Sequence, residues 1–165
     1  MRPSEIIELY RYNEWANHRL LRAASTLAAE LLTEDLGGSY KSIRDVVAHI
    51  ISAEWAWLER WNGRSPDSVP DWVSEDLSVL LEHLSDVEAR RQVFLQGLSE
   101  AALSSEVAFR FLSGAVDHHP LDDLLIHVVD HSSYHRGQLA AKLRQAGAVP
   151  PPTGFIAFKS ELRGS

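Results

Sequence analysis

The sequence contains no cysteine among its 165 residues. This absence excludes disulfide bonds, thiolate metal sites and a thiol nucleophile carried by the chain itself. The sequence also has no apolar run close to the about 20 residues that a membrane-spanning helix needs. The residues that follow Met1 lack the apolar core of a signal peptide. We therefore expect a cytoplasmic protein that does not associate with membranes.

Basic residues are too few and too scattered to form a nucleic-acid footprint. The chain has 16 Lys and Arg residues against 23 Asp and Glu residues, which gives a net charge of −7. Affinity for nucleic acids depends mainly on lysine and arginine side chains that neutralise phosphates, and no basic run is present to do so. We expect a small-molecule substrate and no nucleic-acid partner.

Apolar residues recur at steps of three and four in four long segments, which is the period of amphipathic helices. The segments are residues 4–31, 43–61, 75–98 and 120–145. The chain length suits a single domain over residues 1–165. Residues 106–112 alternate instead, so we predict a short extended crossover before the last helix. The predicted fold class is all-α, an antiparallel four-helix bundle.

Three of the eight histidines are spaced by four residues on the last predicted helix: His127, His131 and His135. Neighbours at this spacing lie one above the other, and two such imidazoles can bind one metal ion. The spacing alone is weak evidence, since chance placement gives about 0.4 such pairs in a chain like this. Relative to the apolar face, His135 lies at about 50°, His131 at about 90° and His127 at about 130°. We therefore predict that His131 and His135 are the ligands, with His127 at the surface or behind them.

His49 is the natural candidate for the third ligand. It lies mid-helix beside the apolar stripe of the second segment. A histidine there is often a hydrogen-bonded residue at the core edge, but bundle cores do build metal sites from facing helices. All-imidazole ligation suits zinc, nickel, copper or iron. Three ligands leave a coordination position open for water or for a thiol from solution, and the metal lowers the pKa of that bound group.

Five further residues are candidates for contacts behind the ligands or with a substrate. Asn13 and Asn17 interrupt the first apolar stripe, either as surface amides or as part of a polar pocket. Glu54 is a candidate general base. Arg136 follows His135 and is either a structural ion-pair partner or a bidentate anchor for a substrate carboxylate. Gln138 is either a surface amide or a hydrogen-bond partner of a ligating histidine. No catalytic residue is assigned.

Four parts of the sequence carry motifs of a known family: Tyr12 to Asn17, Ser42 to Asp45 with His49 and Glu54-Trp55, His127 to Gln138, and the tail from Pro151 to Ile156. In these residues the chain resembles the DinB/YfiT-like family of metal-dependent four-helix-bundle proteins. The family implies a three-histidine site at His49, His131 and His135. Some relatives in the wider superfamily are transferases or isomerases that use a low-molecular-weight thiol such as bacillithiol or mycothiol.

The resemblance implies a divalent-metal protein, with zinc or nickel favoured, that transfers a low-molecular-weight thiol to a small electrophile. A metal-dependent hydrolase or isomerase is one alternative. A non-catalytic metal- or ligand-binding module of a stress response is another, and a structural bundle with incidental histidines is a third. Family analogy, together with Trp55 pointing away from the core stripe, leads us to expect a homodimer.

Overall fold

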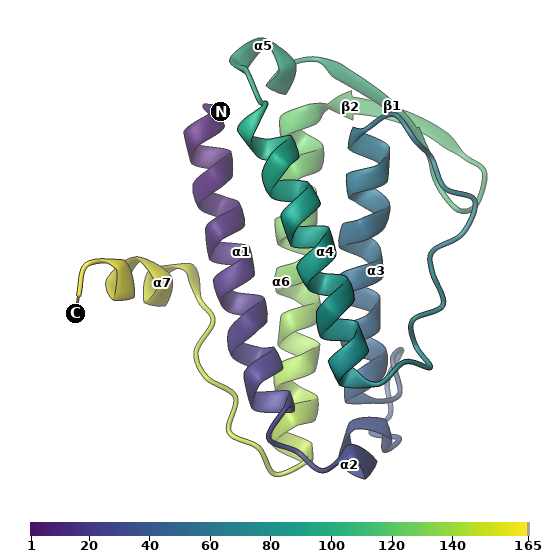
Figure 1. Cartoon of the computed structure of the whole chain (residues 1–165), viewed down its shortest axis with the longest axis vertical. Helices are drawn as coiled ribbons and strands as arrows, with labels where there is room; N and C mark the ends of the chain where they lie inside the picture. The colour runs from purple at the N-terminus through teal and green to yellow at the C-terminus, as the bar shows by residue number, and fades with distance from the viewer. Residues whose placement is uncertain (165) are drawn as a thin grey trace.

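The computed structural model describes residues 1–164 and is mostly helical (Figure 1). Four long helices form a bundle, as predicted. The elements are α1 (Pro3–Ala24), α2 (Ala29–Thr33), α3 (Ile43–Trp61), α4 (Leu77–Gln96), α5 (Glu100–Leu103), β1 (Glu106–Arg110), β2 (Val116–Pro120), α6 (Leu121–Gln145) and α7 (Phe155–Leu162). In the described part of the chain, no helix is long and apolar enough to cross a membrane.

Helix α3 begins and ends where the sequence indicates. Ser42 and Asp45 form a capping box, in which the Asp45 amide donates to Ser42 Oγ at 3.1 Å and the Ser42 amide donates to Asp45 Oδ2 at 2.9 Å. Gly63 follows the helix with φ +75°, a conformation that glycine adopts without steric cost. These local signals fix the helix that carries His49.

The first helix is shorter than predicted, because it ends at Ala24 rather than continuing to residue 31. Two hydroxyl side chains bond back to the last turn: Ser25 Oγ donates to the Leu21 carbonyl at 2.9 Å, and Thr26 Oγ1 donates to the Ala23 carbonyl at 2.7 Å. Such bonds offer the backbone an alternative to helix continuation. The chain then turns into the separate short helix α2.

The predicted crossover is one strand of a hairpin. β1 pairs antiparallel with β2, with Glu106 opposite Pro120 and Arg110 opposite Val116. The sequence predicted the first strand but not the second. β2 carries no alternating apolar pattern, and most of its residues are exposed. Pro120 closes this strand and flanks α6, so the last helix begins one residue later than predicted.

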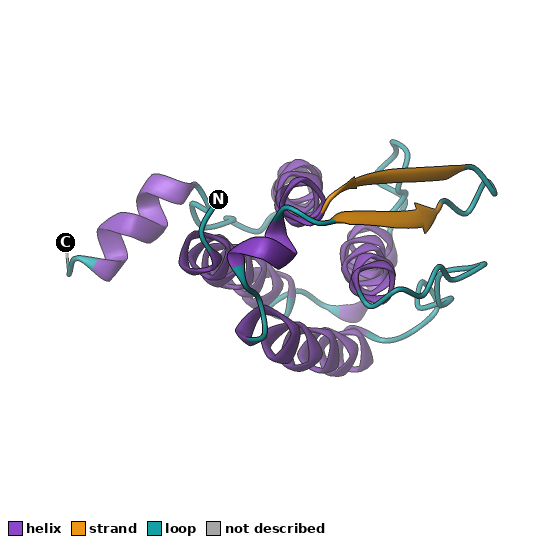
Figure 2. Cartoon of the chain, turned by 90° about the horizontal axis from the view of Figure 1, so that it is seen from above, coloured by secondary structure: helices purple, strands orange, loops and turns teal. Residues whose placement is uncertain are grey.

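The helices are not all antiparallel to their neighbours. In Figure 1, α3 and α4 run in the same direction, and α1 and α6 run in the opposite one. The connection from Asn62 to Asp76 makes this possible, because it is long enough to return along the whole bundle. α3 packs against α6, and α6 also packs against α1. Seen from above, the hairpin extends beyond α3 and α6, while α7 lies on the far side of α1 (Figure 2).

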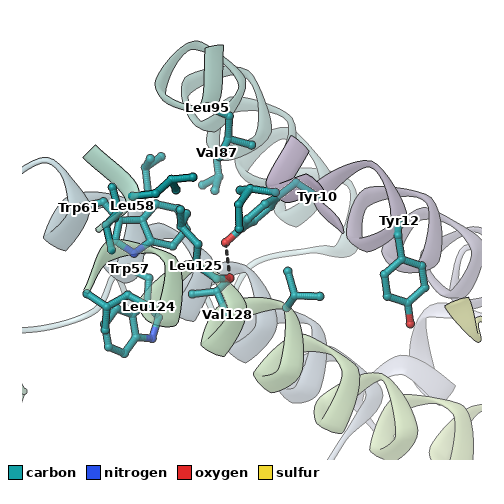
Figure 3. Close-up of a cluster of buried hydrophobic side chains, with 14 of the residues drawn as sticks. Tyr10, Tyr12, Trp57, Leu58, Trp61, Val87, Leu95, Leu124, Leu125 and Val128 are labelled. Atoms are coloured by element: carbon teal, nitrogen blue, oxygen red, sulfur yellow. Dashed lines mark hydrogen bonds between the residues drawn. The ribbon is translucent and has the colours of Figure 1, made fainter. Parts of the chain in front are cut away.

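The core consists of two apolar clusters. One, shown in Figure 3, gathers around Tyr10, Trp61 and Leu125, and the Tyr10 hydroxyl donates to the Leu125 carbonyl at 2.9 Å. The other gathers around Leu20 and Leu84 toward the opposite end of the bundle. Between the clusters lies a buried polar layer, which we define by its members: Asn13, Asn17, Glu54, Arg91, Ser132 and Arg136.

Candidate metal centre

His49, His131 and His135 converge as predicted, because α3 and α6 pack side by side. The Nε2 atom of His49 lies 3.2 Å from His131 Nε2 and 3.1 Å from His135 Nε2. Each residue offers one ligand atom, and these atoms lie within 4.8 Å of one another. The cluster is half-buried, with His135 the most enclosed member.

The spacing of these nitrogens suits a metal ion better than mutual hydrogen bonds. Zinc binds imidazole nitrogen at about 2.0–2.1 Å in tetrahedral geometry, which separates two ligand nitrogens by about 3.3 Å. A single imidazole nitrogen carries either one hydrogen or one lone pair. The Nε2 atom of His49 therefore cannot form a full hydrogen bond with both neighbours at once, whereas three lone pairs directed at one ion are all satisfied.

Gln138 sets the tautomer of one candidate ligand. His135 Nδ1 lies 2.9 Å from Gln138 Oε1. Since this amide oxygen only accepts, His135 Nδ1 carries the hydrogen and Nε2 presents its lone pair to the cluster. Gln138 therefore forms the predicted hydrogen bond with a histidine of the cluster. His131 differs, because its Nδ1 is buried and has no hydrogen-bond partner within residues 1–164.

Tyr40, which lies in the loop before α3, was not predicted from the sequence to contact the histidines. Its ring stacks on His49, with centroids 4.4 Å apart and an interplanar angle of 25°. It also meets His135 edge-on at 5.5 Å. No helical period extends into this loop, so only the fold reveals the contact. Tyr40 and His49 also line a cavity of about 310 Å³ that extends to Trp72.

Burial keeps the imidazoles in the form that binds metal. Burial, followed by the charges of His135 and His131, lowers the pKa of His49 to about 4. Burial, followed by the charges of His135 and His127, lowers the pKa of His131 to about 4. Both rings are therefore neutral at pH 7, and neutral imidazole is the ligating form.

Glu54 lies in the buried polar layer, and the prediction of a general base there is wrong. The side chain is 1% exposed. Its Oε1 accepts hydrogen bonds from Asn13 at 2.7 Å, Asn17 at 3.0 Å and Ser132 at 2.9 Å, and its Oε2 pairs with Arg91. Burial alone acts to raise the pKa of Glu54, but the charge of Arg91 and these hydrogen bonds together lower it. A carboxylate that is 1% exposed and already holds four donors is out of reach of a substrate proton.

Asn13 and Asn17 belong to the polar layer, so the polar-pocket interpretation is confirmed over surface amides. Their Oδ1 atoms accept from Arg136 Nη1 at 2.5 and 2.8 Å. Arg136 is 2% exposed and has no free face for a substrate carboxylate, so its anchoring role is wrong. Arg136 therefore has the structural role that was the alternative, and its partners are two asparagine amides instead of a carboxylate.

Two members of the polar layer were missed from the sequence, Ser132 and Arg91. Arg91 follows Leu84 and Val87 on the apolar stripe of α4, and Leu95 continues the stripe. A charged residue at a core position was the signal that could have found it, because arginine is almost never fully buried without a partner.

His127 and Trp55 complete the account of the predicted residues. His127 is exposed and lies outside the cluster, with its ring centroid 6.1 Å from that of His131. Trp55 packs edge-on against Trp72 of the same chain at 6.3 Å. The exposed tryptophan surface that favoured a homodimer is therefore partly covered from within the chain, and the homodimer stays a prediction.

Two solved structures share this fold. A DinB-like protein from Bacillus cereus ATCC 10987 matches with a TM-score of 0.70 and 17% identity, over 89% of this chain and 94% of that chain. YfiT from Bacillus subtilis matches with a TM-score of 0.70 and 17% identity, over 89% of this chain and 90% of its own. At this identity the similarity establishes the fold alone.

Sequence relatives extend over the same length. Protein DinB of Bacillus subtilis strain 168 is 29% identical over 158 residues, which is 90% of each chain. The protein YizA of the same strain is 22% identical over 161 residues, covering 92% of this chain and 94% of its own. The family model of the DinB family matches residues 1–162. The chain therefore belongs to the DinB family.

Proposed function

We propose that this chain is a metal-dependent enzyme in which His49, His131 and His135 hold one divalent ion, zinc or nickel, through their Nε2 atoms. The observation that carries the proposal is the approach of three imidazole nitrogens to 3.1 and 3.2 Å from His49 across two helices. Hydrogen bonding among the rings cannot satisfy that arrangement. The fixed tautomer of His135 supports the same conclusion.

Three protein ligands are typical of catalytic zinc, whereas structural zinc has four. Such a metal supplies Lewis acidity and lowers the pKa of a group bound at its open position. The chain contributes the positioning: Gln138 orients His135, and Tyr40 packs over His49. The cavity of about 310 Å³ beside His49 gives a small molecule access to the ligand cluster.

The reaction we favour is transfer of a low-molecular-weight thiol to a small electrophile. The chain has no cysteine, so a thiol must come from solution. The family resemblance supports the same class, since relatives in the wider superfamily use bacillithiol or mycothiol. A cytoplasmic location, where such thiols are abundant, and a homodimer belong to this proposal.

Metal-dependent hydrolysis is the second candidate. The structurally similar YfiT is described as a probable metal-dependent hydrolase with an unusual four-helix-bundle topology. Water in place of a thiol at the open position would give that reaction from the same cluster. An isomerase or a non-catalytic stress-response module would use the same metal ligands, so metal content alone does not separate these alternatives.

Elemental analysis by plasma mass spectrometry tests the metal site. Tag-free protein should contain about one zinc or nickel per chain, and His49→Ala, His131→Ala and His135→Ala should each lose it while the helical CD signal stays. His118→Ala is the matched control, because His118 is exposed on β2 and outside the cluster. Wild-type protein that stays metal-free after dialysis against both ions would remove the proposal.

Activity assays then separate the reaction classes. The metal-loaded protein should catalyse conjugation of bacillithiol or mycothiol with 1-chloro-2,4-dinitrobenzene, and His131→Ala should lose this turnover together with the metal. Hydrolysis of p-nitrophenyl acetate without thiol dependence would select the hydrolase instead. Stoichiometric metal without turnover in either assay would exclude both reactions and leave the isomerase and the non-catalytic module.

A further inference from the structure

Lys142 lies in the last turn of α6 and is 7% exposed. Its Nζ atom donates to the Gly37 carbonyl at 2.6 Å and to the Lys41 carbonyl at 3.2 Å. The end of α6 favours a cation here, because the carbonyls of a last helical turn carry partial negative charge. One ammonium group therefore bonds to the backbone on both sides of Tyr40. We refer to residues 36–41 as the tyrosine loop.

Contacts within the tyrosine loop give it one defined shape. The Leu36 amide donates to the Lys41 carbonyl at 2.8 Å, which closes the loop at its base. Gly37 has a φ of +74°, a conformation that glycine adopts without steric cost. The loop is thus closed on itself, and the two hydrogen bonds from Lys142 join it to α6.

Tyr40 is the wall that two cavities beside the histidine cluster share. One cavity of about 310 Å³ is also lined by His49, and another of about 210 Å³ is also lined by Gln138 and Lys142. The first cavity therefore adjoins one candidate ligand, and the second adjoins the side chain that orients His135. The position of the Tyr40 ring determines the shape of the space on both sides.

His49 is held in a different way from His135. His135 Nδ1 bonds to Gln138 at 2.9 Å. Within residues 1–164, the ring of His49 forms hydrogen bonds only through Nε2, toward the other two histidines. Its face is instead covered by Tyr40, stacked at 4.4 Å with an interplanar angle of 25°. Because stacked rings restrict each other's rotation, Tyr40 can do for His49 what Gln138 does for His135.

We propose that Lys142 is a positioning residue of the candidate metal centre. It holds the tyrosine loop closed, so that the stacked Tyr40 ring keeps His49 Nε2 directed at the ion. In the described part of the chain, Lys142 bonds to none of the three histidines and acts through Tyr40. Its effect on metal affinity rests on the proposed function, whereas its effect on the contact between Tyr40 and His49 does not.

Charge alone predicts the opposite effect of removing Lys142. A cation repels a divalent ion, so the loss of its charge should tighten metal binding. Loss of the positioning role should instead weaken metal binding about tenfold, the lower end of the range for residues that orient metal ligands. The sign of the change in affinity therefore separates the two explanations.

Chelator competition for zinc with the full-length protein measures this sign. Lys142→Met keeps an apolar stem of similar length and should bind zinc about tenfold more weakly. Tyr40→Ala should be weakened at least as much, and Tyr40→Phe, which keeps the ring, should not. The double variant Lys142→Met with Tyr40→Ala should bind no more weakly than Tyr40→Ala, because both residues act through one contact.

Lys41→Met is the matched control. It removes the same charge from the same loop, but the Lys41 side chain is 64% exposed, and the backbone carbonyl that accepts from Lys142 remains. The exposed ion pair of Lys41 with Asp35 contributes little, so zinc affinity should change less than about twofold.

Proton–carbon NMR of the histidine rings measures the contact between Tyr40 and His49 in metal-free protein. The His49 signal is assigned by its loss in His49→Gln, and a stacked aromatic ring displaces it upfield. In Lys142→Met the signal should move toward its position in Tyr40→Ala. If Lys142→Met loses its helical CD signal, Gly37→Ala replaces it: the added methyl meets no atom within 4 Å, but a φ of +74° disfavours alanine and loosens the loop.

The outcomes separate the positioning role from the metal site itself. Unchanged or tighter zinc binding by Lys142→Met, additive losses in the double variant, or a His49 signal that stays in place in Lys142→Met would each overturn the role. Wild-type protein that binds no zinc would remove the proposed function, and the NMR displacement would still decide whether Lys142 positions Tyr40 over His49.

Discussion

Arg91→Met should destabilise the protein by about 3 kcal/mol at pH 7, because it leaves the Glu54 carboxylate buried without its counter-charge. Glu54 and Arg91 are each 1% exposed. Removing one partner of a buried ion pair typically costs about 3–5 kcal/mol. Methionine is long and flexible enough to fill much of the space that the arginine stem occupies, so the lost charge should dominate the change.

Protonation of Glu54 limits the loss of stability in Arg91→Met. A buried, unpaired glutamate can raise its pKa to about 8–9 and become neutral at pH 7. Taking up that proton at pH 7, starting from the ordinary value of 4.5, costs about 3.4 kcal/mol, since each pKa unit is worth about 1.4 kcal/mol. At pH 5 the same step costs only about 0.7 kcal/mol.

The difference between wild type and variant should therefore shrink by more than about 2 kcal/mol from pH 7 to pH 5. The sign follows from the direction of each pKa. Arg91 and the polar layer lower the pKa of Glu54 in the wild type, so its contribution is retained above pH 4.5. In Arg91→Met the folded-state pKa is raised, so acidification through that pKa recovers stability.

Urea denaturation at pH 7, 6 and 5, followed by far-UV CD, measures the effect. Arg22→Met is the control, because Arg22 is exposed on α1 and the substitution removes the same charge; its effect should be much smaller and independent of pH. The double variant Glu54→Gln with Arg91→Met should lose the pH dependence. A loss below about 1 kcal/mol at pH 7, or an equal loss at pH 5 and 7, would refute the reasoning.

Two further predictions concern the histidine cluster. Gln138→Leu removes the acceptor that orients His135, and it should weaken zinc about 10–100-fold in a chelator competition while the helical signal stays; unchanged affinity would show that packing alone orients the ring. In the metal-free protein, the pKa values of His49 and His131 are lowered to about 4 from 6.5. The unfolded state therefore binds protons first on acidification, and the free energy of unfolding should fall between pH 6.5 and 4, by up to about 1.4 kcal/mol per pH unit for each ring. Urea denaturation of His49→Gln should show a shallower pH slope, and an equal slope would contradict this cause.

The helices were predictable from the sequence because their signals are local. The capping box of Ser42 and Asp45 and the glycine after residue 62 mark α3 without reference to any other element. The end of α1 was not predictable in this way. The apolar period continues past Ala24, but the hydroxyls of Ser25 and Thr26 bond back to the last turn and end the helix. β2 was missed for the opposite reason: its pairing with β1 supplies the order that its own pattern lacks.

The candidate ligands were predictable by a different route. The rotation of His131 and His135 relative to the apolar face of α6 can be counted along one helix, and the family resemblance pointed to His49. Roles that depend on contacts between helices were not predictable in this way. Glu54 and Arg136 were wrongly predicted to contact a substrate. Their actual partners, Asn13, Asn17 and Arg91, lie on other helices, so the sequence of one helix does not reveal them.

The buried polar layer affects the candidate metal centre, because it joins the same two helices. Ser132 of α6 donates to Glu54 of α3 at 2.9 Å, and Ser132 is adjacent to His131. Sliding α6 along α3 by one residue would move it about 1.5 Å, which breaks that bond and leaves a buried carboxylate short of a donor. A metal ion tolerates deviations of only about 0.2 Å in its ligand distances. The polar layer therefore destabilises every register of α6 on α3 except the one in which the histidine nitrogens of the two helices meet. This selection of one register explains why charged residues are buried at this level of the bundle, where apolar residues would pack as well.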